Sequence, residues 1–134
     1  MTRHELRERI FQTIFQIPFY EDELPEIDVT SADDPTEEDI ATDEDKEYIA
    51  SKAADIKAHI SEIDAEIEAH SNGWKVKRIG KSELAILRLA VYEIKFDDDI
   101  PDKVAVNEAI ELAKAYSDEK ASKFINGVLS GLLS

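Results

Sequence analysis

The sequence predicts an all-α protein, a bundle of five to seven helices. Three observations lead to this prediction. Apolar residues recur at intervals of three and four along most of the chain, which is the spacing of one helix face. Strand-like alternation of polar and apolar residues is scarce. Ser, Thr or Asp residues stand before several of the periodic stretches, where they favour the start of a helix.

The first predicted helix covers residues 3–17. Thr2 is a suitable N-cap, and Glu5 three residues later completes the pattern of a capping box. Pro18 ends the helix, because proline lacks the backbone donor that a helix interior needs. The side chains of the core-facing stripe are Leu6, Ile10, Phe11, Ile14 and Phe15.

An apolar seam between residues 49 and 67 predicts a second helical region. Its members alternate in steps of four and three, as in a coiled coil: Ile49, Ala53, Ile56, Ile60, Ile63 and Ile67. Ser61 and Asp64 indicate a restart near residue 60, so the seam is one helix or two. Gly73 suits the C′ position, where helices commonly turn left-handed.

The C-terminal half predicts three further helices. Residues 82–96 are apolar almost all round, which is typical of a helix buried on most faces, and Ser82 is its expected N-cap. Residues 97–101 form a turn. Residues 103–116 and 118–133 complete the bundle.

Three single residues in this half carry structural expectations. Asp118 is a suitable cap for the last helix. Gly127 costs that helix roughly 1 kcal/mol relative to alanine, so we expect another helix to approach closely there. Arg88 lies inside the most apolar helix, and we expect it to be a structural ion partner.

The chain of 134 residues has a net charge of −15, but the charge is local. Residues 21–48 contain fourteen acidic residues and one lysine. Ten of these acidic residues lie in a proline-containing loop expected over residues 18–42. Residues 73–134 contain ten acidic and ten basic residues. Both ends of the chain therefore remain available to an anionic partner.

Composition and motifs argue against an enzyme and against a bound metal or cofactor. The absence of cysteine excludes disulfides, thiolate metal sites and a cysteine nucleophile. The three histidines, His4, His59 and His70, show no metal-binding spacing, and no phosphate-binding or nucleophile motif occurs. Asp97, Asp98 and Asp99 are interpreted as a solvated turn. Without a signal peptide or membrane-length apolar run, we expect a cytoplasmic protein with no membrane partner.

The first helix contains the best candidate contacts for nucleic acid. Arg3, His4 and Arg7 lie within little more than one turn, and an arginine fork matches phosphate geometry and stacks on bases. The pattern alone is more typical of an ordinary charged outer face. Phe15 and Phe124 fit a core role, but if half exposed either ring would offer a stacking platform for an unpaired base.

Three linked motifs resemble the NusB family of transcription antitermination proteins. They are Glu83–Ile94 (ELAILRLAVYEI) with Ile100-Pro101, then Val104–Lys114 (VAVNEAIELAK), then Lys123–Leu129 (KFINGVL). Trp74, just ahead of the first motif, also looks like the family. This resemblance implies about six to seven helices in two packed subdomains of one domain, here about residues 1–72 and 73–134.

The resemblance also implies partners and an RNA surface. NusB-type proteins bind single-stranded boxA RNA together with NusE, a small-subunit ribosomal protein, and act with the RNA polymerase elongation complex, promoting read-through chiefly in ribosomal RNA operons. Phe15 falls where relatives often have tyrosine, and Glu83 offers an acceptor for a base amino group. The expected RNA-binding residues are Arg3, His4, Arg7, Phe15, Glu83, Lys123, Phe124 and Asn126.

Two other functions compete with this one. An acidic helical adaptor or homodimer would use the seam between residues 49 and 67, and would require that seam to be exposed. The RNA-binding domain of a ribosomal RNA cytosine methyltransferase would need a catalytic domain, for which we expect no room in a chain ending at Ser134. Self-association is left open.

Overall fold

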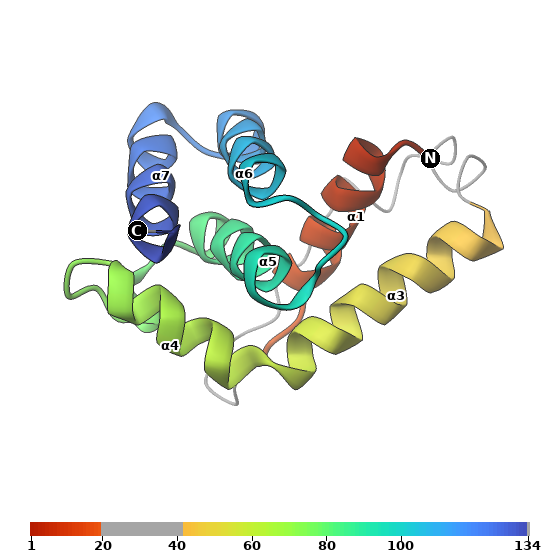
Figure 1. Cartoon of the computed structure of the whole chain (residues 1–134), viewed down its shortest axis with the longest axis horizontal. Coiled ribbons are helices and arrows are strands. Elements are labelled where there is room, and N and C mark those ends of the chain that lie inside the picture. Colours follow the sequence, from red (N-terminus) through yellow and green to blue (C-terminus); the bar gives the residue numbers. More distant parts are fainter. Residues whose placement is uncertain (20–41, 134) are drawn as a thin grey trace. The chain divides into compact units, whose positions relative to one another are not determined.

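The computed structural model describes residues 1–19 and 42–133, and these residues form helices joined by short connections without a strand (Figure 1). The prediction of an all-α fold is therefore confirmed. Most of the loop expected over residues 18–42 lies outside the described residues. The helices are α1 (Arg3–Phe15), α3 (Asp43–Ala58), α4 (Ile60–His70), the 3-10 helix η2 (Val76–Arg78), α5 (Lys81–Phe96), α6 (Asp102–Tyr116) and α7 (Glu119–Leu133).

The chain divides into two compact units, Met1–Ala58 and His59–Ser134. In the first unit α1 packs on α3, and in the second α5 lies against α4, α6 and α7. The expected division near residue 72 differs from this one, because α4 packs with α5 and α7.

The first helix starts as predicted. Thr2 Oγ1 accepts the backbone N–H of Glu5 at 3.1 Å, and Glu5 Oε1 accepts the backbone N–H of Thr2 at 3.4 Å. This is the predicted capping box, which satisfies two donors that a helix start otherwise leaves free. The buried apolar side chains of the unit come from both helices: Ile10, Phe11, Ile14, Ala53 and Ile56.

The seam forms two helices, with the break at His59. His59 has φ −109° and ψ 14°, outside the helical region, and its ring lies 4.2 Å from the ring of Phe96. Ser61 and Asp64 do not cap α4, because the helix already begins at Ile60. At its other end Asn72 (φ 59°) takes the C′ position expected for Gly73, which follows with φ 89°.

Helix α5 is the core of the second unit and carries a buried ion pair. Residues 84–93 are all buried, as the apolar pattern predicted. Arg88 Nε donates to Asp64 Oδ1 at 3.0 Å and Nη2 donates to Asp64 Oδ2 at 2.9 Å, with both side chains 5% exposed. The expected structural role of Arg88 is confirmed. The N-cap is Gly80, so the expectation that Ser82 caps the helix is wrong.

The last helix confirms one expectation and corrects another. Asp118 Oδ1 accepts the backbone N–H of Ala121 at 2.8 Å, so Asp118 caps α7. Gly127 faces solvent, and a Cβ atom added there would meet nothing within 4 Å, so the expected close approach is wrong. The close approach occurs one turn later, where a Cβ on Gly131 would lie 3.3 Å from His70 Nδ1.

The turn between α5 and α6 forms as predicted, but it is only partly solvated: Asp98 and Asp99 are exposed, whereas Asp97 is 8% exposed. Asp97 Oδ1 accepts the backbone N–H of Asp99 at 3.1 Å, a hydrogen bond that stabilises a tight turn. Across the part of the chain that the structure describes, none of the helices combines the length and apolarity needed to cross a lipid bilayer.

The ion pair generates a stability prediction. Arg88→Met leaves the Asp64 carboxylate buried without this guanidinium, and should lower the free energy of unfolding by about 3–5 kcal/mol. Urea unfolding followed by far-UV circular dichroism measures the change. Lys95→Met, at an exposed cation of the same helix, is the matched control. A loss below about 1 kcal/mol for Arg88→Met would contradict the structural role.

The two glycines of α7 generate a second prediction. Gly127→Ala should raise the free energy of unfolding by roughly 0.5–1 kcal/mol, because it adds a helix-favouring residue in open space. Gly131→Ala should raise the free energy of unfolding by less, since its Cβ would press on His70. Thermal unfolding of the two variants side by side tests this order, and equal gains would refute it.

Candidate nucleic-acid interface

The exposed start of α1 presents two of the three candidate side chains predicted there. Arg3 and His4 are exposed in the first turn, and His4 Nε2 lies 3.9 Å from Glu8 Oε2 on the next turn. Arg7 is only 7% exposed, so the expectation that it lies on the outer face is wrong. Helical spacing alone placed it beside Arg3, but its side chain is buried. The available cationic surface of α1 is therefore smaller than the pattern indicated.

Phe15, at the end of α1, is less than half exposed, so it does not meet the condition stated for a stacking role. Its ring is partly exposed, and the ring centroid lies 6.0 Å from that of the buried Phe11 at an interplanar angle of 38°. Contact with Phe11 holds one side of the ring while part of its surface stays open.

On α7 the predicted residues follow from the amphipathic pattern of the helix. Ile125, Val128 and Leu129 are buried, which leaves Lys123 and Asn126 exposed. These two are three residues apart, so they are neighbours on the helix surface. Phe124 is partly exposed beside them. The helix therefore offers a cation, an amide and part of an aromatic ring to a partner.

Glu83, the predicted acceptor for a base, already has a partner within the second unit. Its Oε1 atom accepts a hydrogen bond from Ser117 Oγ at 2.8 Å, and its carboxylate lies against the backbone of Gly80. Ser117 follows α6, so this contact joins the end of α6 to the start of α5. Sequence reasoning missed it because the two residues are 34 positions apart.

The predicted residues fall into two groups, one in each unit. Arg3, His4, Arg7 and Phe15 belong to the first unit, and Glu83, Lys123, Phe124 and Asn126 belong to the second. Within residues 1–19 and 42–133, no three or more His, Cys, Asp or Glu side chains are grouped to hold a metal ion.

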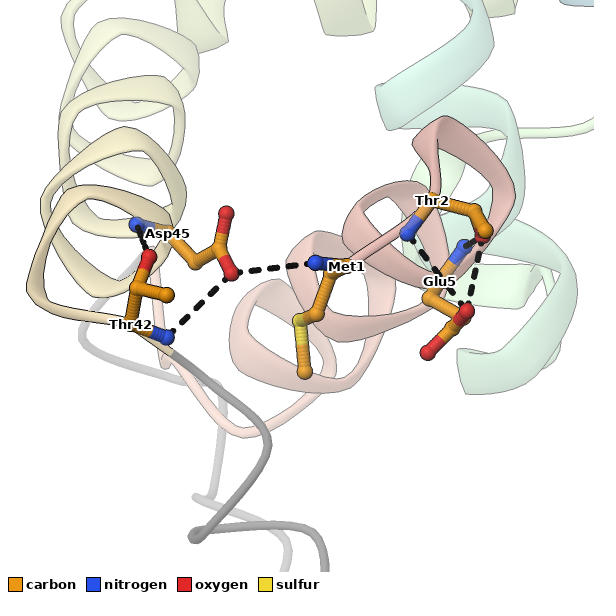
Figure 2. A network of polar contacts seen from close by, with 5 residues as sticks. All are labelled: Met1, Thr2, Glu5, Thr42 and Asp45. Carbon is orange, nitrogen blue, oxygen red and sulfur yellow. Dashed lines mark hydrogen bonds and ion pairs between the residues drawn. The ribbon is translucent and has the colours of Figure 1, made fainter.

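A polar network fixes the start of α1 beside the start of α3 (Figure 2). The Met1 ammonium donates to Asp45 Oδ2 at 3.2 Å, and the backbone N–H of Thr42 donates to the same oxygen at 3.2 Å. Thr42 Oγ1 in turn accepts the backbone N–H of Asp45 at 3.0 Å. Arg3 and His4 thus lie two and three residues after the anchored Met1.

The same network lowers the pKa of Asp45 below its ordinary value. The main cause is the hydrogen bond from the Thr42 backbone, and the Met1 ammonium lowers it further, while partial loss of hydration acts the other way. A lowered pKa means that the carboxylate stabilises the fold above its ordinary pKa. That contribution is lost as the pH falls through the lowered value.

The fold and the exposed groups together define an all-α protein with cationic and aromatic side chains on α1 and α7. The model of the NusB family matches residues 4–134. The Transcription antitermination protein NusB of Agathobacter rectalis is 47% identical over 131 residues, which cover 97% of this chain and 98% of that protein. The chain therefore belongs to the NusB family.

Solved structures agree with this assignment. The chain resembles T. maritima NusB with a TM-score of 0.79 and 33% identity, over 98% of this chain and 90% of that one. It also resembles a chain in the crystal structure of the antitermination factors NusB and NusE in complex with dsRNA. That match has a TM-score of 0.68 and 29% identity, over 98% and 97% of the two chains.

The Asp45 network generates a pH prediction. Asp45→Asn should be less stable than the wild type at neutral pH, and the difference should shrink in acid, once the wild-type carboxylate is protonated too. Urea unfolding at several values between about pH 7 and pH 2 measures it. Asp43→Asn, in the same first turn, controls for the loss of one charge. A difference independent of pH would contradict the role of the carboxylate.

Proposed function

We propose that this chain is a transcription antitermination factor that binds boxA RNA of ribosomal RNA operon transcripts together with a NusE-type ribosomal protein. The observation that carries the proposal is the match to NusB relatives over nearly the whole chain. A related structure that holds NusB and NusE with dsRNA supports both the partner and the class of ligand. The protein acts by binding and not as an enzyme, and its partner on the transcript is the RNA polymerase elongation complex.

The exposed groups set the strength of RNA binding. Arg3 and Lys123 are exposed cations, whereas Arg7 is buried, so few charges are available to phosphates. Each phosphate neutralised on a single strand contributes about −0.7 to the log–log dependence of affinity on salt. We therefore infer weak binding by the chain alone and tighter binding when a partner shares the RNA. A role on nascent transcripts implies a cytoplasmic location.

The competing adaptor function is not favoured by the packing of the apolar seam. Ile56, Ile63 and Ile67 are fully buried and Ala53 is 5% exposed. In the first unit this face of α3 packs on α1, and in the second α4 packs on α5 and α7. An adaptor or homodimer built on the seam would need these side chains exposed.

Binding titrations test the proposed function. Fluorescence anisotropy of labelled boxA RNA, scrambled RNA and a duplex should show a preference for boxA that strengthens when a NusE-type protein is added. Lys123→Ala should weaken boxA binding and reduce the salt slope by about 0.7. Lys103→Ala, at an exposed lysine on α6, is the matched control.

Two outcomes would contradict this function. Equal affinity for boxA and scrambled RNA under all conditions would exclude sequence-specific recognition. Equal affinity with and without the NusE-type protein would exclude a shared RNA surface.

A further inference from the structure

The connection between α4 and α5 contains a run of positive charge that the proposed RNA site does not use. Residues 74–81, here called the basic segment, read WKVKRIGK and contain four cations and no acidic residue. The whole chain has a net charge of −15, so this concentration is unusual within it. The cations of the basic segment are Lys75, Lys77, Arg78 and Lys81.

The backbone at the start of the basic segment is fixed. Asn72 and Gly73 have φ values of 59° and 89°, a left-handed pair that reverses the chain after α4. Ser71, which is 1% exposed, then forms hydrogen bonds with both the backbone N–H and the backbone C=O of Trp74. The Trp74 N–H donates to Ser71 O at 3.2 Å, and Ser71 Oγ donates to Trp74 O at 2.5 Å.

The rest of the basic segment is also ordered by local contacts. The 3-10 turn is closed by the Arg78 N–H, which donates to Lys75 O at 2.8 Å. Ile79 is 8% exposed and anchors the segment in the core, directly before the Gly80 N-cap of α5. The backbone is therefore held at both ends and across its middle.

The side chains of this ordered segment nevertheless face solvent. Trp74 is 53% exposed, the highest value for a large apolar side chain among the described residues. Lys75, Lys77, Arg78 and Lys81 are all exposed. Lys75 Nζ lies 3.9 Å from Glu68 Oε2, but the lysine side chain is 77% exposed, and such surface pairs open at little cost.

We propose that the basic segment binds the phosphate backbone of single-stranded RNA, with Trp74 stacking on an unpaired base. A positive surface beside an exposed aromatic ring is the combination that proteins use for single strands. An acidic protein partner would match the cations but would give the indole ring no specific role. The ordered backbone lowers the entropic cost of presenting that ring.

This inference rests on the proposed function and extends it. Lys81 is the first residue of α5, and Glu83 follows two residues later in the same turn. An RNA strand at Glu83 would therefore continue along the basic segment with nucleotides outside the boxA element. RNA with a flanking extension should bind more tightly than the bare element, through contacts that depend on charge more than on sequence.

The fluorescence of Trp74 tests the stacking contact directly, because it is the only tryptophan in the chain. The probe is an extended boxA RNA added to the complex with a NusE-type protein, with the Trp74→Phe complex as the blank. Saturating RNA should quench the Trp74 emission. Anisotropy of labelled RNA in the same samples reports binding independently of Trp74.

Variants test how much Trp74 and the cations of the basic segment contribute to the affinity for RNA. Trp74→Ala should weaken binding of the extended RNA at least about five-fold, while Trp74→Phe keeps a stacking face and recovers most of the affinity. The triple variant Lys75→Gln, Lys77→Gln and Arg78→Gln should reduce the salt slope by up to about 2. The matched control, Lys95→Gln, Lys103→Gln and Lys114→Gln, removes equal charge from exposed lysines of the same unit and should change the slope much less.

The outcomes separate this inference from the proposed function. If RNA binds but Trp74 emission is unchanged and the two triple variants behave alike, the inference fails while the proposed function stands. If the basic-segment variant instead loses the NusE-type protein in the absence of RNA, the segment is a protein-docking surface and the inference fails. If the wild-type complex binds no RNA, both are wrong.

Discussion

The buried ion pair between Arg88 and Asp64 determines how α4 faces α5. Removing two charges from water is costly, and the pair is tolerated because both carboxylate oxygens are bound, at 3.0 and 2.9 Å. By holding these two helices together, the ion pair also fixes both ends of the connection between them. That connection contains all of the basic segment except Lys81, and it stays ordered although most side chains of the segment lie in water.

Local features of the fold could be predicted from the sequence because their partners lie within one helical turn. The capping box of Thr2 and Glu5 and the cap at Asp118 are of this kind. The start of α5 was predicted within one residue, but its N-cap was not, because Glu83 lies against Gly80 and binds Ser117 from a distant helix end. The close helix contact was assigned to Gly127 instead of Gly131, because periodicity does not specify which neighbour faces which turn.

In the candidate site, the sequence predicts which residue types are suited to RNA but not how exposed each side chain is. Arg3 and Arg7 are equally suited to phosphate by chemistry, yet one is exposed and the other is buried. The basic segment was not predicted as a binding surface, for another reason. Residues 73–134 carry ten acidic and ten basic residues, and a net charge of zero over that range conceals four cations gathered at its start.

The exposure of Trp74 has a practical consequence for spectroscopy on this protein. An indole ring that is already 53% exposed in the native state changes its surroundings little when the chain denatures. Its emission maximum is therefore a poor monitor of global denaturation. The same property makes it a clean optical reporter, since a change in its signal marks an event at the connection between α4 and α5.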